Sequence, residues 1–527
     1  MRGASVKELI SAFEKISFIH HQAQDTWVTR MENVSTTDFE SYCALIERCG
    51  FVRYSLRKNK EKKFVAYQRD NAGVFLNIYY GTGEITVVME ENSAYFSFND
   101  VPCNHQLSPQ ITQLYLEDFG MSYAIRLSDG RYIVIDGGRE LIPDADRLME
   151  CLKDGTPDHK PVIAAWIFSH PHPDHYYCFF PFLERHGEAV IIEKFLINFP
   201  EADDLIHYPK LVSKSNQEAG ITANAHMLRL WETIRELGIP IYCPHTGQVY
   251  KVGDATLEIL ASMDDTIGLS ENINAASVVI RMELGGQIIL WATDASCESV
   301  RLAERYGNYL KADILQVPHH GFGIGAPAAN IAAYQLIAPQ VCLLPVSDFN
   351  AFTAFCAYRK CTQYLMTRCD VKEMITGEVT RTLTLPYTAD PQGKKRLQDQ
   401  FDAGQENAGA RTWVFGELNT ANPEDFVFSV LNATHAEAEI SVELFFENGV
   451  RTIRSIKTTV LPLRIRKICI TDPEDVTRDS AYYNPWSIEK NEIPVAAPFA
   501  VRFMSSVPVV ISHQNHQKSY HSSICHL

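Results

Sequence analysis

Residues 169–175 read Ser-His-Pro-His-Pro-Asp-His, a stretch in which four potential metal ligands fall within six positions. It directly follows residues 162–168, Val-Ile-Ala-Ala-Trp-Ile-Phe, an apolar run with the length of a buried strand. Imidazole nitrogens and carboxylate oxygens are the ligands that zinc and neighbouring divalent metals prefer. A loop that leaves a strand end can direct alternate side chains to one side, which predicts two adjacent metal positions. The expected ligands are His170 and His172 for the first metal, and Asp174 and His175 for the second.

Three more strand-like segments end in polar residues. Residues 132–138 read Tyr-Ile-Val-Ile-Asp-Gly-Gly, residues 288–294 read Ile-Ile-Leu-Trp-Ala-Thr-Asp, and residues 313–321 read Asp-Ile-Leu-Gln-Val-Pro-His-His-Gly. Together with residues 169–175 and with Asn-Ala-Ala-Ser at 274–277, they resemble the metallo-β-lactamase superfamily of metal-dependent hydrolases. Over about residues 108–387, the motifs are most similar to the branch that contains the soluble hydrolase domain of DNA-uptake competence proteins.

The resemblance implies a fold and a role for each motif. The implied fold is α/β, a four-layer αβ/βα sandwich of two mixed sheets with helices outside, and the metals lie where strand-end loops converge. Asp294 is expected to bridge both metals, and Asp174 to take up a proton. Of the adjacent histidines, His320 is the expected ligand because family members with a single histidine place it before a small residue. The residues expected behind the ligands or facing the substrate are Asp136, His319 and Asn274.

The chain departs from the family pattern in two motifs, and a third is ambiguous. Thr293 stands where the branch has glycine, and Phe322 stands where it has serine or threonine, beside the second metal. The first metal also requires a third histidine. We favour His245, in the turn at residues 243–248, while the alternative is an ordinary turn residue and a water that completes the site. The other candidates, which we expect at the surface or at a helix end, are His186, His207 and His226.

A centre with two divalent cations indicates that the protein catalyses hydrolysis. Two divalent cations lower the pKa of a bridging water from about 15.7 to near 7, and the metal-bound hydroxide attacks a carbonyl or phosphoryl centre. We expect two zinc ions, with manganese, iron or a single ion as alternatives. The branch resemblance favours phosphodiester bonds in a small-molecule, nucleotide or nucleic-acid substrate, and the runner-up is an esterase, lactonase or amidase. The other class is a non-catalytic binding or signalling protein that uses this fold as a scaffold.

Composition indicates a large protein with ordinary globular cores. The length of 527 residues suggests about three domains, and 46% hydrophobic with 21% charged residues is an ordinary globular balance. A net charge of −16 argues against broad non-specific binding to nucleic acid, but it leaves a nuclease open because metals supply positive charge locally. The 13 cysteines include no Cys-x-x-Cys pair, no leader pattern opens the chain, and no apolar run has the length of a membrane span. We therefore expect a cytoplasmic protein without a membrane partner.

Two further domains flank the central one, which we place at residues 106–388. Residues 1–105 predict a small α+β domain, with a helix from Thr36 and an antiparallel sheet whose last hairpin turns at residues 81–83. Residues 389–410 are polar and contain glycine, which indicates a linker. Residues 411–527 show short apolar or alternating runs between turns, the pattern of a β-sandwich.

The C-terminal segment also carries a resemblance of its own. Residues 431–440, 461–464 and 505–510 resemble motifs of the sensory-rhodopsin transducer family of small β-sandwiches. That family implies homo-oligomerisation and binding of a ligand or protein. The family's Arg-Leu-Asp after the final strand is replaced by His-Gln-Asn-His at residues 513–516.

Overall fold

The fold is taken from a computed structural model of the chain. It describes residues 16–513 except 23–25, 60–61, 70–71, 80–82, 91–97, 99, 101–105, 155–159, 200–216, 266–272, 296–300, 323–328, 354–355, 357, 407–409, 435, 447–451, 473–474, 476 and 479–496. The chain divides into two compact units. The first comprises Met1–Ala351 with Ala357–Leu397, and the second comprises Phe352–Cys356 with Gln398–Leu527.

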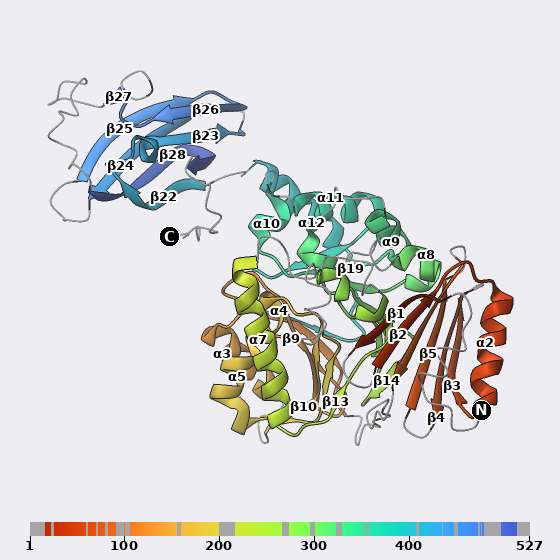
Figure 1. The fold of residues 1–527 in the computed structure, drawn as a ribbon. Helices are drawn as coiled ribbons and strands as arrows, with labels where there is room; N and C mark the ends of the chain where they lie inside the picture. The colour runs from red at the N-terminus through yellow and green to blue at the C-terminus, as the bar shows by residue number, and fades with distance from the viewer. Residues whose placement is uncertain are drawn as a thin grey trace. The chain divides into compact units, whose positions relative to one another are not determined.

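The first unit begins with a six-stranded antiparallel sheet of order β1-β2-β6-β5-β4-β3 (Figure 1). The strands are β1 (Ile16–Gln22), β2 (Thr26–Met31), β3 (Val52–Asn59), β4 (Lys62–Arg69), β5 (Ala72–Tyr79) and β6 (Glu84–Glu90). Helix α2 (Thr36–Arg48) covers one face, where Phe39 and Ile46 pack against alternate residues of β4 and β6. The helix predicted from Thr36 and the predicted sheet are therefore present, and Ser35 caps the helix. Of the predicted turn at 81–83, only Gly83 lies among the described residues.

The opposite face of this sheet packs on the central domain. Val28, Ala66 and Val88 form one buried cluster with Met263 and Ala276. Side chains alternate between the two faces of a strand, so both faces of β4 and β6 are covered. Residues 64–67 of β4 are all apolar and buried, and β6 is buried from Ile85 to Glu90.

The central domain contains two mixed sheets. The first runs β13-β12-β10-β9-β8-β7-β21, with β11 also paired to β10, and the second runs β14-β15-β16-β17-β18-β19-β20. The strands of the first are β7 (Gln110–Gln113), β8 (Ser122–Arg126), β9 (Tyr132–Asp136), β10 (Val162–Phe168), β11 (Ile191–Ile192), β12 (Phe195–Ile197), β13 (Ile241–Tyr242) and β21 (Arg381–Thr384). The strands of the second are β14 (Val249–Val252), β15 (Ala255–Ala261), β16 (Val279–Leu284), β17 (Gln287–Trp291), β18 (Ile314–Gln316), β19 (Val341–Leu344) and β20 (Glu373–Thr376).

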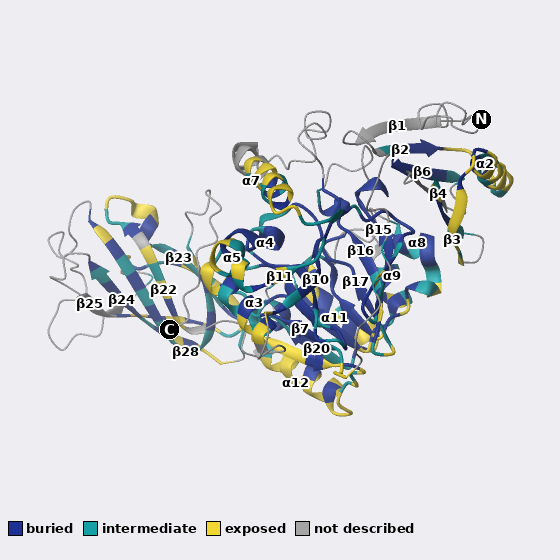
Figure 2. Ribbon diagram, turned by 90° about the horizontal axis from the view of Figure 1, so that it is seen from below, coloured by how far each residue is buried: buried dark blue, intermediate teal, exposed yellow. Residues whose placement is uncertain are grey.

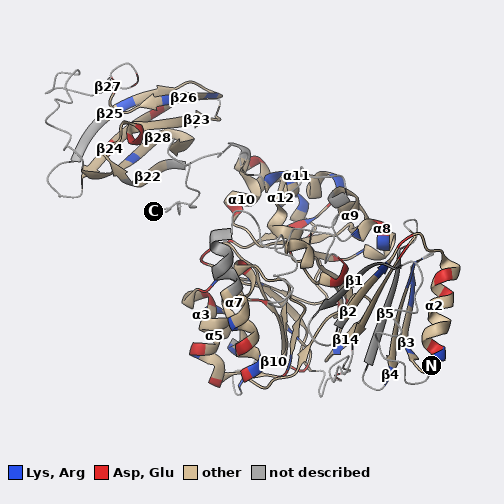
Figure 3. Cartoon of the chain, viewed as in Figure 1, with Lys and Arg blue, Asp and Glu red and all other residues tan. Residues whose placement is uncertain are grey.

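One buried core joins the two sheets. Ile125, Ile135 and Ile167 of the first sheet share a cluster with Leu257 and Ile289 of the second. The outer face of the first sheet forms another core with helices α3 (Ile142–Asp154), α5 (Phe179–His186) and α7 (Gln217–Glu236). The strands are buried while the outer sides of these helices are exposed (Figure 2). Charged residues follow the same division, since β10 carries none and the helices carry several (Figure 3). The predicted α/β class is confirmed.

The remaining helices connect strands of the second sheet, except α12, which follows β21 and runs from the first unit into the second. They are α8 (Leu302–Tyr306), α9 (Ala329–Ile337), α10 (Asp348–Phe352), α11 (Arg359–Arg368) and α12 (Gly393–Glu406). The short helical turns are α4 (Pro173–Tyr176), η1 (Gly187–Ala189), η4 (Met263–Asp265), η5 (Ile273–Ala276), η6 (Gly307–Leu310) and η7 (Pro318–Gly321). Most of the segment predicted as a linker is thus the helix α12. Across the described part of the chain, no helix is both long and apolar enough to cross a membrane.

The second unit is all-β outside its leading helical residues. Its sheet runs β26-β23-β28-β24-β25-β27, with β22 also paired to β28. The elements are β22 (Ala410–Asn419), η8 (Pro423–Phe426), β23 (Val427–Asn432), β24 (Ala438–Phe446), β25 (Thr452–Val460), β26 (Arg464–Cys469), β27 (Thr477–Arg478) and β28 (Pro498–His513). The long strand β28 pairs with β24 through its first half and with β23 through its second, so it spans both sides of the buried core.

Candidate metal centre

Four loops that leave the carboxyl ends of parallel strands supply the centre. β9 ends at Asp136 and its parallel neighbour β10 leads into residues 169–175. In the second sheet, β17 leads to Asp294, and its parallel neighbour β18 leads to residues 318–321. The carboxyl ends of parallel strands meet at one edge of a sheet, so each pair of loops is brought together by strand pairing. The shared core between the sheets then brings the two pairs toward each other.

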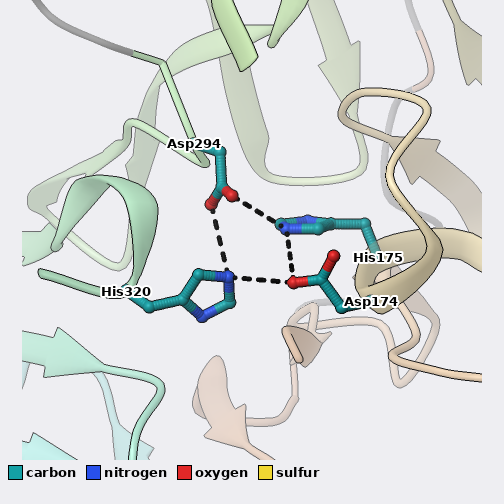
Figure 4. A group of neighbouring side chains, drawn as sticks. All are labelled: Asp174, His175, Asp294 and His320. Atoms are coloured by element: carbon teal, nitrogen blue, oxygen red, sulfur yellow. Dashed lines mark ion pairs between the residues drawn. The ribbon is translucent and has the colours of Figure 1, made fainter. Parts of the chain in front are cut away.

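Asp174, His175, Asp294 and His320 form one buried group (Figure 4). His320 Nε2 lies 3.2 Å from Asp174 Oδ2 and 3.6 Å from Asp294 Oδ1. His175 Nε2 lies 3.3 Å from Asp294 Oδ2 and 3.6 Å from Asp174 Oδ2. Ligand bonds of about 2.0–2.2 Å in a tetrahedral site place the donor atoms about 3.3–3.6 Å apart. The four side chains therefore have the spacing of ligands to one divalent cation.

His170, His172 and Asp294 form a second group that shares the Asp294 carboxylate with the first. His170 Nε2 lies 3.7 Å from Asp294 Oδ2, and the rings of His170 and His172 are 4.7 Å apart. Because one carboxylate has two oxygens, Asp294 can bind one cation in each group. The arrangement thus offers two adjacent positions.

Several buried polar atoms converge at the centre without hydrogen-bond partners. Among the described residues, His170 Nε2, His175 Nε2, His320 Nε2 and Asp294 Oδ1 are buried and have no hydrogen-bond partner. Buried polar atoms are costly to leave unpaired, so convergent atoms of this kind indicate a bound group. Nitrogen and carboxylate donors fit zinc and its neighbours among divalent metals.

Asp136 and Ser169 contact Nδ1 of His175, a candidate ligand. Asp136 Oδ2 lies 2.7 Å from His175 Nδ1 and accepts a 2.7 Å hydrogen bond from Ser169 Oγ, while Oδ1 accepts from Ser169 N at 2.8 Å. All three residues are fully buried. A carboxylate at Nδ1 holds the proton there and leaves Nε2 as the metal-binding atom. Ser169 was missed as a functional residue, although its position between the strand and His170 was a usable signal.

Gln316 links the loops of Asp294 and His320 through side-chain hydrogen bonds. Its amide nitrogen donates to Val317 O at 2.7 Å and to Thr293 O at 3.3 Å, while its amide oxygen accepts from Thr293 N. The signal for this residue was a fully buried polar side chain within an otherwise apolar strand.

Strained backbone also gathers at the centre. Asp136, Thr293, His319 and His320 all have positive φ, between 49° and 58°. Non-glycine residues adopt this conformation rarely, and it persists where the surroundings over-determine it, most often at functional sites. Gly321 continues the left-handed run with a φ of 84°, and a Cβ there would lie 2.9 Å from Leu344.

Charge coupling sets the protonation of the centre. Burial, reinforced by His175, lowers the pKa of His170 well below 6.5, so this ring is neutral. Burial also disfavours charge on His320, but the carboxylates of Asp294 and Asp174 outweigh it and raise the pKa of His320 to about 9. Against the effect of burial, His175 and His320 hold the pKa of Asp294 well below 3.8. Protonated rings thus neutralise the carboxylates, and a divalent cation can take the place of those protons.

His319 and aromatic side chains border the centre. His319 is 35% exposed, and its Nε2 lies 4.0 Å from Asp294 Oδ2 and 3.2 Å from Asn274 Nδ2. Phe119 packs on the His320 ring at 4.1 Å, and the 51% exposed Phe322 lies 5.5 Å from His319. The centre therefore combines a buried ligand set with a partly exposed imidazole beside an exposed aromatic ring.

The prediction that His245 completes the first site is corrected by the structure. His245 Nδ1 lies 2.7 Å from Asp264 Oδ2, and its Nε2 contacts Glu90, so both ring nitrogens belong to a different cluster. Its backbone turn is held separately, since His245 N donates to the side chain of Gln248. Sequence order could not reveal this because Glu90 comes from the N-terminal sheet.

Two of the other candidate histidines lie elsewhere. His186 Nε2 lies 2.7 Å from Asp146 Oδ1, and His226 stacks on Tyr177. His207 is outside the described residues. Within the ranges that the structure describes, no further histidine joins the group of His170 and His172.

Comparison with known proteins identifies the central region. A model of the metallo-beta-lactamase superfamily matches residues 116–250, which include the loop at 169–175 and end before Asp294. The chain thus contains a domain of this superfamily. No curated protein matches the chain.

Three solved structures are similar to parts of the chain. The metallo-beta-lactamase fold protein YhfI from Bacillus subtilis is 14% identical, and the match covers 52% of this chain and 99% of that one with a TM-score of 0.31. The Anabaena sensory rhodopsin transducer is 19% identical, with 21% and 86% covered and a TM-score of 0.16. Thermotoga maritima 1070 is 19% identical, with 20% and 86% covered and a TM-score of 0.14.

Proposed function

We propose that this chain, which carries a metallo-β-lactamase superfamily domain, is a metal-dependent hydrolase that acts on phosphodiester bonds. The observation that carries the proposal is the Asp294 carboxylate, which two groups of buried donor atoms share. Two divalent cations held by these groups would activate a water and polarise the bond under attack. Superfamily members are generally metal-dependent hydrolases, which supports the reaction class.

The side chains of the centre divide the remaining work. Asp136 fixes the tautomer of His175 so that Nε2 can bind metal. Asp174, whose Oδ2 lies beside both His175 and His320, is positioned to accept a proton from the attacking water. Asp294 stays ionised, because the two neighbouring rings hold its pKa low despite burial, and it keeps the two groups at a constant separation.

His319 and the aromatic border support a phosphodiester substrate with a planar group. An amide nitrogen only donates, so Asn274 Nδ2 donates to His319 Nε2 and the neutral ring carries its own proton on Nδ1. That N–H can donate to a phosphoryl oxygen as charge develops on it. The exposed ring of Phe322, with Tyr358 at 5.8 Å, can stack on a nucleobase or another planar substituent.

The test pairs two substrates with one ligand variant. Protein purified without chelator is analysed for metal and assayed on bis(p-nitrophenyl) phosphate and on p-nitrophenyl acetate. We expect diester cleavage that falls at least about 100-fold in Asp294→Ala, because this change removes a ligand from both groups. The matched control is Asp370→Ala, an exposed aspartate that pairs with Lys372 and Lys394. Cleavage of the acetate alone would move the assignment to an esterase, lactonase or amidase.

The alternative class places the function in the second unit. There, a cavity of about 680 Å³ is lined by Lys457, Arg466 and Asp475 among others, and Arg466 donates to Thr459 O at 3.0 Å. A charged cavity of this size suits a small polar ligand. This binding role, with or without self-association, would be favoured by a chain that holds no metal and gains no hydrolysis when zinc or manganese is added.

A further inference from the structure

A second cluster of metal-ligand side chains lies between the N-terminal sheet and the central domain. Glu90 is the last residue of β6, and Cys243 and His245 lie in the loop between β13 and β14. One donor atom from each of the three lies within 4.8 Å of the others. Glu90 and His245 are buried, and Cys243 is partly buried. This cluster shares no residue with the centre around Asp294.

We propose that Glu90, Cys243 and His245 bind one structural divalent cation of the zinc class, which fastens the N-terminal sheet to the central domain. The inference is independent of the proposed hydrolysis. A carboxylate, a thiolate and an imidazole are the three ligand types that zinc binds in proteins, and a thiolate distinguishes this set from the all-His/Asp centre.

The environment of His245 supports metal binding. Its Nδ1 lies 2.7 Å from Asp264 Oδ2, the same atom that accepts a 2.7 Å hydrogen bond from Ser262 Oγ. Asp264 is fully buried and is further contacted by Asn198 Nδ2 at 3.4 Å. A carboxylate that receives the Nδ1 proton directs Nε2 toward a metal, the arrangement typical of zinc-bound histidine. His245 Nε2 here faces Glu90, as His175 Nε2 faces Asp294 in the first centre.

The three donor atoms lie close enough together to share one cation. Bonds of about 2.0 Å to nitrogen and oxygen and about 2.3 Å to sulfur place ligand atoms about 3.3–3.8 Å apart. The limit of 4.8 Å among the three atoms includes this range. Glu90 Oε1 contacts His245 Nε2 directly. A cation that replaces the proton between them would require the two atoms to move apart, to about 3.3 Å.

The position of the cluster indicates what the cation would do. Glu90 and His245 are 155 residues apart in the chain, and they meet where the two domains pack. The buried Arg30 of β2 donates to Asp264 O at 2.7 Å in the same region. Val28 and Val88 of the sheet share a buried cluster with Ala276 of η5, the turn that also carries Asn274. A cation here would hold the N-terminal sheet against the turn that positions Asn274 beside His319.

A metal-free bridge is the competing explanation. A protonated His245 could donate to Glu90 and Asp264 at once, which would satisfy both carboxylates without a cation. That bridge needs no thiol, whereas the cation requires Cys243 as a ligand. The role of the thiol therefore separates the two explanations.

Cobalt substitution tests the thiol directly. Zinc is exchanged for Co²⁺ in the full-length protein, and the near-ultraviolet absorption of a thiolate–cobalt bond is recorded together with the metal content. We expect this band in the wild type. It can be assigned to the cluster of Glu90, Cys243 and His245, because no candidate ligand in the centre around Asp294 is a cysteine. In Cys243→Ser, the band should disappear and one equivalent of metal should be lost. Cys151→Ser, which removes another partly buried thiol, should retain both.

A second measurement avoids a variant that fails to fold. In the wild type, the alkylation rate of Cys243 is followed by mass spectrometry of its peptide, with and without stoichiometric zinc. Protection of at least about tenfold by zinc is expected, because the thiolate that reacts is the atom that binds metal. Absence of the band in the wild type, or a rate that zinc does not change, would overturn the proposal. Neither result would alter the metal content assigned to the centre around Asp294.

Discussion

Asp136→Asn is the most informative single change in the metal centre, because it alters one atom that contacts no metal. In the wild type, Asp136 Oδ2 lies 2.7 Å from His175 Nδ1, and both side chains are fully buried. The asparagine keeps the shape, and its oxygen can still accept from Ser169 N as Asp136 Oδ1 does at 2.8 Å. The amide nitrogen then faces Nδ1, and an amide nitrogen can only donate.

The expected consequence is a tautomer change. His175 Nδ1 must give up its proton to accept from the amide, so the neutral ring carries its proton on Nε2. That atom lies 3.3 Å from Asp294 Oδ2 and is the one expected to bind metal. Loss of a carboxylate behind a ligand histidine lowers metal affinity by about 10–100-fold, equivalent to about 1.4–2.7 kcal/mol. The loss should fall on the group of Asp174, His175, Asp294 and His320.

Competition with a chromophoric zinc chelator measures the affinity, and urea unfolding confirms that the variant folds. Asp146→Asn is the matched control, since Asp146 also lies 2.7 Å from a histidine nitrogen, that of His186, but at the surface. We expect its zinc affinity to equal that of the wild type. If folded Asp136→Asn binds zinc within twofold of the wild type, the tautomer argument is refuted.

Three further predictions concern stability. In the metal-free protein, the pKa of His320 rises from about 6.5 when unfolded to about 9 when folded, so its stabilisation is complete below pH 6.5 and is lost as the pH approaches 9; urea titrations should show this loss without metal and not with zinc bound. Leu257→Ala, in the core between the sheets, should cost about 2–5 kcal/mol, and a cost below 1 kcal/mol would contradict that core. Ser35→Ala removes a capping box from α2 and should cost about 1 kcal/mol, while Thr36→Ala, beside the cap, should cost less.

The residues that gather in the candidate metal centre could be picked out in the sequence because each lies shortly after an apolar strand. Four ligand-type residues in residues 169–175 have no common structural explanation, and the Asp and His that end two later strands complete the pattern. The α/β class could also be predicted, because the buried strands of a parallel sheet appear in the sequence as continuous apolar runs. Strand ends and ligand types are local properties, and a sequence records local properties directly.

The placement of His245 depended on tertiary structure alone. Its loop has the composition of a ligand turn, but its partners Glu90 and Asp264 come from a different sheet and from a separate turn. Gln316 shows the same limit, because only the meeting of the β17 and β18 loops brings the backbone of Thr293 to its side chain. For the centre around Asp294, the sequence alone indicated which residues can bind metal and that they follow buried strands. Packing of the sheets decided which of them meet, because contacts between distant segments depend on how whole domains bury their apolar faces.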